Sequence, residues 1–536
     1  MMKRFGVHKS VWKKDVSREP QPSLERDIDC DVVVVGAGIT GLTTALYLKE
    51  AGLRVVVLDE HEVGAGTSGA TTGHITAVPD IKLKTLVSHF GEDNSRLAVN
   101  SLIQAINQIE NITQRYKINC EFKRVDSFQF AETSKQNEEL VDQAEIAQLL
   151  GFDCQLTGEL NLPFTFEGAI RFQGQAQFHA LKYLYGIADK ITGNESYLFE
   201  NTRVHKIDDG EKCRLQTNRG EVVCSQLILA THTPIGRYIS LQSRLAPYFS
   251  YVLAVRLKNP PSPGLYWDMN DPYFYMRQVG NPDDKLWIIG GCDHKTGQEV
   301  NTYERYLLLE EYIKQRFEVE DIQFYWGDEV FESVDGLPYV GKIPFTKNTF
   351  TATGFAGVGL TNATMSAKLM SDLILNKENE LKELYDPSRV KLFSSFNKFT
   401  RENANVARRM VSDRMAETDA EINDDTQVDA VDCVASGEGK IVDRQGDKIA
   451  VYRDDTKHLH VFSPVCPHLG GIVHWNKAEK TWDCPCHGSR FSPTGEVLCG
   501  PALDDLEKVF IDAKAGNKRA GYASQLVDGL SLSCLI

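Results

Sequence analysis

The sequence has no long apolar segment: none of its hydrophobic runs approaches the roughly 20 residues that a membrane-spanning helix requires. Its N-terminal stretch, MMKRFGVHKSVWKKD, is basic but lacks the apolar core of a secretory signal peptide. Positive charge is also in deficit, since 59 Lys and Arg face 74 Asp and Glu, and this disfavours a nucleic-acid surface. We therefore expect a cytoplasmic protein with no membrane insertion and no nucleic-acid partner.

A disulfide framework is a further absence. The 12 cysteines are spread over 536 residues, and a cytoplasmic protein of this size is not expected to be held together by disulfides. Cysteines cluster with histidines near the C-terminal end, which directs attention to a metal site there. The length itself predicts two to four domains, each large enough to bury a core.

The clearest motif that is present lies near the N-terminus, in the segment Asp31–Gly41, DVVVVGAGITG. Four consecutive valines that lead into a glycine-rich turn predict a buried parallel strand. Gly36 permits the tight turn, Gly38 leaves room for a pyrophosphate, and Gly41 allows the following helix, residues 39–49, to pack on the sheet. The helix N-terminus then faces the phosphates, so the unit predicts a site for FAD or NAD.

A second strand, residues 53–58, ends in Asp59, an acid placed to bind a ribose hydroxyl. The next segment, HEVGAGTSGATTGHIT (residues 61–76), interleaves glycines with Thr and Ser. Such a backbone either forms a flexible loop or approaches a polar ligand closely.

At this point the chain resembles the D-amino-acid oxidase and glycine oxidase superfamily of FAD amine oxidoreductases, in which a small-residue segment follows the ribose acid and passes the flavin. The resemblance favours FAD over NAD. No cysteine stands between Cys292 and Cys433 to tether a flavin as in sarcosine-oxidase-like relatives, so non-covalent FAD is expected. The cofactor contacts that it implies in this part of the chain are Gly36, Gly38, Ile39, Thr40, Gly41, Asp59, Thr67, Ser68, Thr71, Thr72 and His74.

Two later segments extend the resemblance. Val204 stands where family members place a backbone contact to adenine, and ILATHTP (residues 228–234) resembles a strand ending in Ala-Thr-Gly, with His232 in place of the glycine. The run TGFAGVGLT, residues 353–361, is again glycine followed by a helix, either a packing turn or a helix end directed at the flavin. Its predicted cofactor contacts are Gly354, Gly357, Gly359, Leu360 and Thr361.

Alternating, aromatic-rich runs at residues 250–258, 273–278 and 285–291 predict an antiparallel sheet. In the superfamily such a sheet roofs the flavin and contacts the substrate. The catalytic candidates are therefore Tyr275, Arg277, His294 and Trp326, each weighed against an ordinary role as a solvated, turn or core residue. A substrate carboxylate would need an arginine, for which Arg277 and Arg256 are available.

Near the C-terminal end, Cys466-Pro-His468 and Cys484-Pro-Cys-His487 are separated by fifteen residues. Two Cys and two His invite a metal, and the boxes CPHLGG and CPCHGSRF resemble the Rieske [2Fe-2S] domain. The resemblance implies that Cys466 and Cys484 bind one iron and that His468 and His487 bind the other. A Cys2His2 zinc site is the alternative.

Two departures from respiratory Rieske proteins affect the expected potential. Gly471 occupies the place of a disulfide-forming cysteine, which leaves Cys486 without that partner, and Phe491 replaces a tyrosine that donates a hydrogen bond to a ligand sulfur. Because hydrogen bonds to sulfur raise the potential, a value in the lower part of the Rieske range is predicted.

The sequence thus predicts an α/β plus all-β fold: a Rossmann-like FAD-binding domain with an interleaved antiparallel-sheet substrate domain, followed by a small Rieske β-domain. An acidic, partly helical linker precedes the Rieske domain, either solvated or docking a basic partner. The expected ranges are 28–90, 165–240 and 335–380 for FAD binding, 91–164 and 241–334 for the substrate domain, 381–427 for the linker, and 428–536 for the Rieske domain.

A two-electron acceptor fused to a one-electron centre predicts a relay. We expect hydride transfer from an amine or amino acid to FAD, followed by single-electron transfer through the cluster to an external carrier. The alternatives are a reductase that runs in the opposite direction, and a non-catalytic electron carrier or redox sensor. A Rieske oxygenase is disfavoured because too little chain follows the cluster to build a mononuclear-iron domain.

Overall fold

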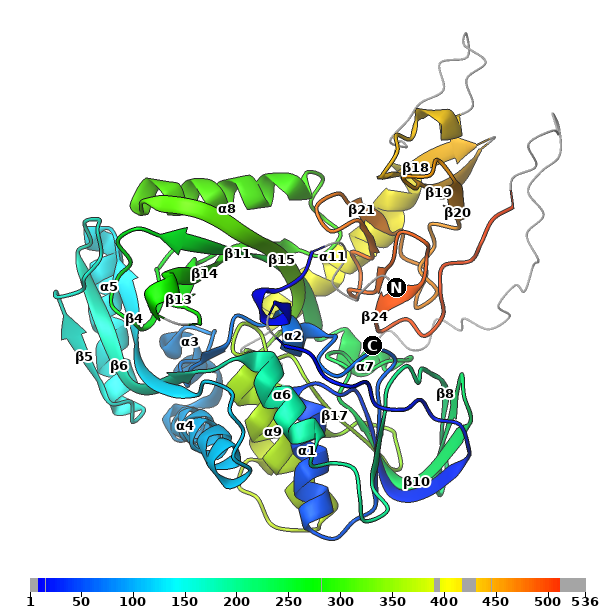
Figure 1. Cartoon of the computed structure of the whole chain (residues 1–536), viewed down its shortest axis with the longest axis horizontal. Coiled ribbons are helices and arrows are strands. Elements are labelled where there is room, and N and C mark those ends of the chain that lie inside the picture. The colour runs from blue at the N-terminus through cyan, green and yellow to red at the C-terminus, as the bar shows by residue number, and fades with distance from the viewer. Residues whose placement is uncertain are drawn as a thin grey trace.

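The computed structural model describes residues 8–14, 16–280, 282–389, 396–416, 430–444 and 446–510. It contains two large β-sheets with helices packed around them, and two small β-sheets at the C-terminal end (Figure 1). This arrangement confirms the predicted fold class. Residues 511–536 and most of the acidic run after Asp413 lie outside the described residues.

The first sheet is built around strand β1 (Ile28–Val35), which pairs in parallel with β2 and β10. Its valines are buried on both sides: Val32 and Val34 pack into one hydrophobic core and Val33 and Val35 into another. Helices cover the first of these faces, which explains the unbroken apolar run. The order is β16 (Tyr339–Lys342), β17 (Thr349–Thr353), β10 (Glu221–Leu229), β1, β2 (Val55–Leu58) and β7 (Tyr197–Phe199), with β8 (Val204–Asp209) and β9 (Cys213–Thr217) beside β10.

The second sheet is mostly antiparallel, and the predicted aromatic runs form its strands β11, β13 and β14. One face packs toward the first sheet and its helices, and helix α8 (Thr302–Arg316) covers the other (Figure 1). The order is β15 (Val319–Ser333), β11 (Leu245–Leu257), β14 (Leu286–Lys295), β13 (Tyr275–Gln278), β12 (Leu265–Trp267), β4 (Lys123–Ala131), β6 (Gly168–Gln177) and β3 (His74–Ile75), with β5 (Cys154–Thr157) beside β6.

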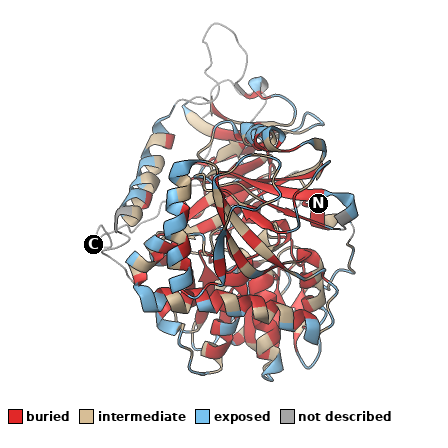
Figure 2. Ribbon diagram, turned by 90° about the vertical axis from the view of Figure 1, so that its left-hand side faces the viewer, coloured by how far each residue is buried: buried red, intermediate tan, exposed pale blue. Residues whose placement is uncertain are grey.

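The helices surround the two sheets, so that buried strands form the interior while helices present exposed faces (Figure 2). Helix α1 packs against α9 and α6. The remaining bounds are α1 (Ile39–Glu50), α2 (Thr67–Ala70), α3 (Leu83–Phe90), α4 (Glu92–Arg115), α5 (Ser134–Leu149), α6 (Ala180–Ala188), α7 (Ile239–Gln242), α9 (Gly359–Ile374) and α10 (Lys382–Tyr385).

The C-terminal lobe contains a three-stranded and a four-stranded antiparallel sheet. Helix α11 (Phe396–Met415) lies between this lobe and the second sheet (Figure 1), and its Val406 and Met410 pack on the lobe's core. The part of the predicted linker that forms α11 is therefore packed against protein. The strands are β18 (Glu438–Arg444), β19 (Asp447–Arg453), β20 (Leu459–Phe462), β21 (His474–Asn476), β22 (Thr481–Asp483), β23 (Arg490–Phe491) and β24 (Val497–Cys499).

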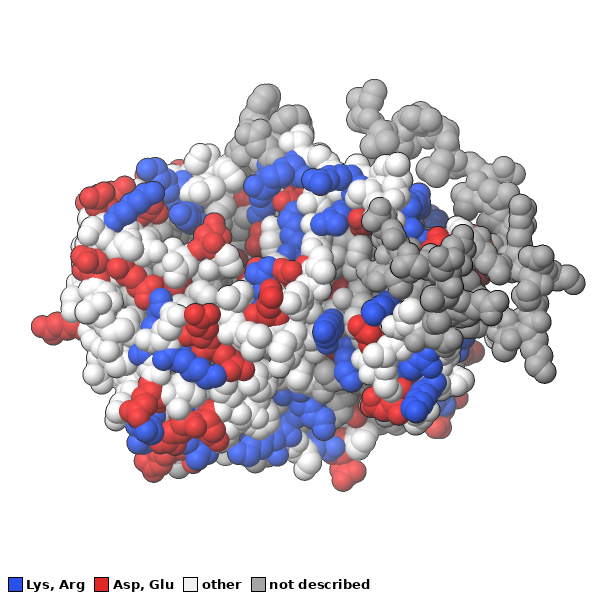
Figure 3. Space-filling model, turned by 90° about the horizontal axis from the view of Figure 1, so that it is seen from above, with Lys and Arg blue, Asp and Glu red and all other residues white. Residues whose placement is uncertain are grey.

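Within the described residues, no helix combines the length and the apolar character that a bilayer-crossing segment needs. On the face shown in Figure 3, Lys and Arg side chains are interspersed with Asp and Glu, so the net charge of −15 does not gather there as one acidic patch.

Candidate active site and metal centre

The glycine turn after β1 has no room for side chains. Gly36 has φ +108°, and a Cβ built on it would lie 2.4 Å from the carbonyl oxygen of Ala230. A Cβ on Gly41 would lie 1.9 Å from the carbonyl oxygen of Gly36, and one on Gly38 would lie 2.8 Å from the Ser68 hydroxyl oxygen. The three glycines are therefore required for the turn itself and for the approach of residues 66–70.

Asp59 lies beside this turn, as the ribose contact requires. Its carboxylate is buried and accepts hydrogen bonds from the backbone N–H of Ala37 at 2.7 Å and of His61 at 2.9 Å. Each carboxylate oxygen can accept more than one hydrogen bond. The acid can thus fix the loop and still accept a ribose hydroxyl.

The small-residue segment after Asp59 is clamped along its backbone. Four consecutive carbonyls, those of residues 69–72, each accept a hydrogen bond from a different side chain, so the segment is held rigid beside the glycine turn. In order from residue 69 the donors are Ser10 (2.7 Å), Trp326 (2.8 Å), Trp12 (2.5 Å) and Arg277 (2.5 Å). Two of the predicted catalytic residues, Trp326 and Arg277, are among them.

Each nitrogen of the Arg277 guanidinium donates to a backbone carbonyl. Besides Thr72, Arg277 donates to the carbonyl oxygens of Gln278 at 2.9 Å and Phe178 at 3.0 Å, and it is only 2% exposed. Burial lowers its pKa to about 9. This geometry gives Arg277 a positioning role and leaves little capacity for a substrate carboxylate. Arg256 is 3.9 Å from Asp321 and partly exposed.

Tyr275 lies where the sheet faces the clamped segment. Its ring meets His74 edge-to-face at 5.5 Å, and its hydroxyl lies 3.3 Å from that of Ser250. Nδ1 of His74 bonds the Thr72 hydroxyl at 3.1 Å, and burial lowers the His74 pKa to about 3, so the ring is neutral. Tyr275 and His74 are thus brought together at one site.

His294 lies on the opposite face of the same sheet. Its ring nitrogens bond the Tyr251 hydroxyl at 3.0 Å and the Lys295 carbonyl oxygen at 2.9 Å, and Tyr251 packs in the core under α8. The neighbouring residue, Asp293, interacts instead with Ser250 and Tyr275. The predicted candidate and its neighbour therefore face different sides of the sheet.

Asp293 is the acid that sequence reasoning missed. One of its carboxylate oxygens is inaccessible to solvent and has no hydrogen-bond partner among the described residues. Burial raises its pKa to about 7; Ser250 opposes this shift, and Asp80 and Glu332 add to it. The face of the sheet on which Asp293 lies is set by an irregularity in the β11–β14 pairing and by the left-handed φ of +60° at Cys292. Neither feature can be predicted from the local sequence.

The later glycine segment approaches this site. Asp80 accepts hydrogen bonds from the Tyr273 hydroxyl at 2.7 Å and from the Gly357 N–H at 3.3 Å. Thr361 in the first turn of α9 donates to the carbonyl oxygen of Thr76 at 2.8 Å. Gly354 has φ +79°, and Val204 is buried at the start of β8. Flavin and adenine contacts by the segment of residues 353–361 and by Val204 remain predictions.

His232, which stands where the resembled strand has a glycine, adopts a backbone conformation that favours glycine. Its φ is +70°, a left-handed value that His adopts more readily than most residues. Its ring bonds the Glu329 carbonyl oxygen at 2.8 Å and packs edge-on against Phe331, while Thr353 donates to its own carbonyl at 2.7 Å. These contacts offset the strain.

The C-terminal lobe brings the four predicted iron ligands together in a buried site. Cys466, His468, Cys484 and His487 are between 2% and 9% exposed. The two thiols are in hydrogen-bonding contact, and the two imidazole rings lie 5.1 Å apart and nearly perpendicular. Burial lowers the pKa of His468 to about 3 and that of His487 to about 4, so both rings are neutral, the form that binds metal.

The four side chains form two pairs, one of cysteines and one of histidines. Across the described residues, no three His, Cys, Asp or Glu side chains converge as a single metal ion requires. A Cys pair and a His pair are the donor set of a two-iron cluster with two ligands on each iron.

Cys486 lies where a disulfide partner at position 471 would reach it. A Cβ built on Gly471 would stand 2.6 Å from the Cys486 sulfur, and Gly471 has no left-handed φ that would exclude a side chain. A cysteine at position 471 would therefore be close enough to Cys486 to form the missing disulfide. Ser489 contacts Cys466, and Phe491 is packed in the same core. The low potential predicted from the sequence stays a prediction.

We expect Gly471→Cys to form a disulfide with Cys486 under oxidising conditions. Closing a loop of this length would stabilise the lobe by about 3 kcal/mol in the chain-entropy model. Thiol titration of the denatured variant should find one free thiol fewer than in the wild-type chain, and urea unfolding should shift upward. Gly471→Ala controls for the added Cβ; an extra free thiol in Gly471→Cys would contradict the geometry.

Comparison with known proteins agrees with both predicted domains. The family model for FAD dependent oxidoreductases matches residues 31–373, and the model for the Rieske [2Fe-2S] domain matches residues 425–510. Both resemblances inferred from the sequence are confirmed.

One relative matches across both domains, and others match the first of them. The chain is 32% identical over 509 residues to the "Putative Rieske 2Fe-2S iron-sulfur protein YhfW" of Bacillus subtilis (strain 168), covering 94% of this chain and 98% of that protein. Gamma-glutamylputrescine oxidoreductase of Escherichia coli (strain K12) is 24% identical, over 66% of this chain and 86% of its own. The crystal structure of glycine oxidase from Geobacillus kaustophilus superposes with a TM-score of 0.55 at 19% identity, covering 68% of this chain and 99% of that one, and it shares the fold.

Proposed function

Since the chain belongs to the FAD dependent oxidoreductase family and ends in a Rieske [2Fe-2S] domain, we propose that it is an amine dehydrogenase that passes electrons to an external one-electron carrier. FAD accepts electrons in pairs and the cluster transfers them singly. The residues of this chain bind both groups, orient the amine and exclude water.

The observation that carries the choice of an amine is the polar lining opposite the clamped segment. Asp293 has an unpartnered carboxylate oxygen there, close to Ser250 and Tyr275. Arg277, the arginine best placed to bind a substrate carboxylate, donates to three backbone carbonyls instead. Among the described residues, the groups that act on Asp293 are Ser250, Asp80 and Glu332, and none of them is a cation. Such an acid favours a substrate that is positively charged and carries no carboxylate next to the reacting nitrogen.

Asp293 should make the proposed activity depend on pH. Its pKa is raised to about 7, so the carboxylate that binds the amine forms as the pH rises through 7, and kcat/KM should rise with it. We expect the rise of kcat/KM with pH to be absent in Asp293→Asn. At pH 8 its kcat/KM should be lower than that of the wild type by about 10- to 100-fold, which corresponds to the roughly 1.5–3 kcal/mol of a hydrogen bond to a charged group. Steady-state rates with an amine from pH 5.5 to 9 measure both effects.

The same shift predicts an opposite effect on stability. A raised pKa means that Asp293 favours folding below its unfolded value near 3.8, and that this contribution is lost as the pH rises through about 7. Asp293→Asn should therefore be more stable than the wild type at pH 8, by urea unfolding, while it is less active. A variant that is both less stable and less active at pH 8 would indicate damage to the fold.

The test of the substrate class is an anaerobic panel. Matched pairs, such as putrescine with ornithine and N-methylamines with N-methyl amino acids, are mixed with the oxidised protein, and the loss of flavin absorbance is followed. Bleaching by the amine of each pair at the higher rate supports the proposal. Faster bleaching by the amino acids would overturn the choice of class, and a flavin that no compound bleaches would overturn the dehydrogenase.

A further inference from the structure

The C-terminal lobe docks on the flavin-binding part of the chain through backbone contacts that only glycine allows. A Cβ on Gly297 would lie 2.7 Å from the Asp483 carbonyl oxygen, and one on Gly488 would lie 2.6 Å from a carboxylate oxygen of Glu329. Gly500 similarly abuts Ile235, at 2.8 Å. Gly297 and Gly488 thus stand at direct contacts between the second cluster box and the second sheet.

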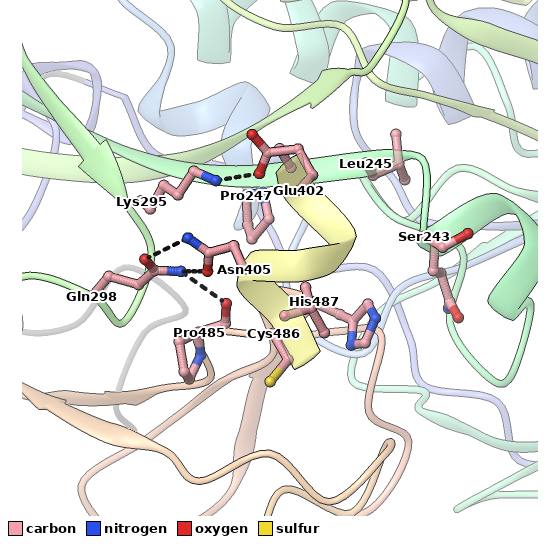
Figure 4. A pocket seen from close by; sticks show the side chains of 13 residues that line it. Ser243, Leu245, Pro247, Lys295, Gln298, Glu402, Asn405, Pro485, Cys486 and His487 are labelled. Atoms are coloured by element: carbon pink, nitrogen blue, oxygen red, sulfur yellow. Dashed lines mark hydrogen bonds and ion pairs between the residues drawn. The ribbon is translucent and has the colours of Figure 1, made fainter. Parts of the chain in front are cut away.

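Hydrogen bonds reinforce the same interface. The Gln298 side chain donates to the Pro485 carbonyl oxygen at 3.3 Å and to Asn405 of α11 at 2.9 Å (Figure 4). The Tyr306 hydroxyl donates to Glu479 at 2.7 Å, and the N–H of Gly236 donates to the Pro501 carbonyl oxygen at 3.0 Å. The lobe is held from several sides.

Two of these contacts reach an iron ligand, since His468 interacts with the Gly236 backbone as well as with Gln242. Nε2 of His468 lies 3.1 Å from the side-chain oxygen of Gln242, which is the last residue of α7 and only 2% exposed. The Gln242 side-chain nitrogen donates to the carbonyl oxygens of Pro234 at 2.9 Å and Gly236 at 2.7 Å. Both of its N–H groups are therefore used, and its oxygen can only accept.

The hydrogen bond to Gln242 fixes the tautomer of His468. Because the Gln242 oxygen accepts, Nε2 of His468 must carry the hydrogen, which leaves Nδ1 as the ring nitrogen able to bind iron. A ligand ring that donates its second N–H to an oxygen becomes more basic. It then stabilises the more highly charged, oxidised iron and lowers the potential.

The loop that anchors Gln242 also reaches the nucleotide turn. It follows β10, and its Ala230 carbonyl stands directly against Gly36. Within it, His232 bonds the backbone of Glu329, whose carboxylate lies against Gly488 beside His487. Residues 230–236 therefore contact the predicted FAD site at one end and the cluster lobe at the other.

We propose that Gln242 is a positioning residue that seats His468 against the flavin-binding part of the chain, fixes its ring hydrogen on Nε2 and lowers the potential of the cluster. The inference depends on the cluster that the Rieske domain binds and uses no substrate. It can therefore hold or fail independently of the proposed amine dehydrogenase.

The test is a mediated potentiometric titration of the purified holoprotein with dithionite, followed by the EPR signal of the reduced cluster. Gln242→Met keeps the side-chain length but removes the acceptor. We expect its potential to rise by the equivalent of a roughly tenfold change in the equilibrium constant, about 59 mV for a one-electron couple, with altered g-values. Gln242→Glu keeps an acceptor oxygen and should remain at or below the wild-type potential.

Gln298→Met is the matched control, because Gln298 bonds the same lobe at Pro485 but does not contact an iron ligand. It should leave the potential unchanged. Iron content and thermal unfolding of each variant establish that the lobe is folded and loaded. The proposal is overturned if Gln242→Met leaves the potential unchanged or lowers it, or if Gln298→Met shifts it equally.

Discussion

Replacing Gly41 by alanine is expected to abolish FAD binding. The added Cβ would stand 1.9 Å from the Gly36 carbonyl oxygen and 3.2 Å from Val34, so the turn and α1 cannot both keep their places. Overpacking of this kind costs about 1–3 kcal/mol or more, and here it displaces the backbone that cradles the cofactor. The purified variant should release no FAD on denaturation while it retains its iron and the iron-sulfur absorbance.

Gly158→Ala is the control, because a Cβ at this exposed glycine meets nothing within 4 Å. It should bind FAD at the wild-type ratio and unfold at the wild-type temperature. Full FAD occupancy in Gly41→Ala would show that the turn can move and that the close contact between Gly41 and Gly36 does not govern the cofactor site.

Loss of one cluster ligand should separate the two halves of the reaction. Cys466→Ala removes a buried thiolate from a site built of two Cys and two His, and the cluster should be lost because each iron needs both of its protein ligands. Iron should fall to background and the EPR signal should vanish. An amine should still bleach the flavin, while reduction of a one-electron acceptor such as ferricenium should fall to background.

Cys486→Ala is the matched control for this variant. Cys486 is buried in the same box, two residues from Cys484, yet the motif does not assign it to iron. It should keep the iron and the electron transfer. Equal loss of iron in both variants would contradict the assignment of ligands, and undiminished ferricenium reduction by Cys466→Ala would contradict the relay.

The parts of this account that the sequence could predict are those encoded by neighbouring residues. Gly36, Gly38 and Gly41 are needed by a turn that occupies a few positions, and the spacing of Cys466, His468, Cys484 and His487 is local to two loops. The strands of the second sheet were predictable from their alternation. Their pairing order was not, because it depends on contacts across the chain.

The contacts of several predicted site residues depend on distant partners. Arg277 looked free because nothing local shows that the carbonyls of Thr72 and Phe178 turn toward it. His294 is a candidate from its place after two glycines, and Asp293 is not, because the pairing irregularity that decides which of them lies near Tyr275 has no local signal. Gln242 belongs to no sequence motif, and its partner His468 is 226 residues away in sequence. Their contact could therefore not be predicted from the sequence.

The central claim is that electrons from an amine pass from the flavin to the cluster within one chain. The most direct measurement is low-temperature EPR of the oxidised holoprotein after anaerobic addition of an excess of a bleaching amine, which supplies more than the three electrons that FAD and the cluster accept together, with spins counted against iron and FAD on the same sample. The account predicts a Rieske-type signal that appears as the flavin bleaches and that is absent in Cys466→Ala. A fully bleached flavin with no cluster signal in the wild type would contradict it.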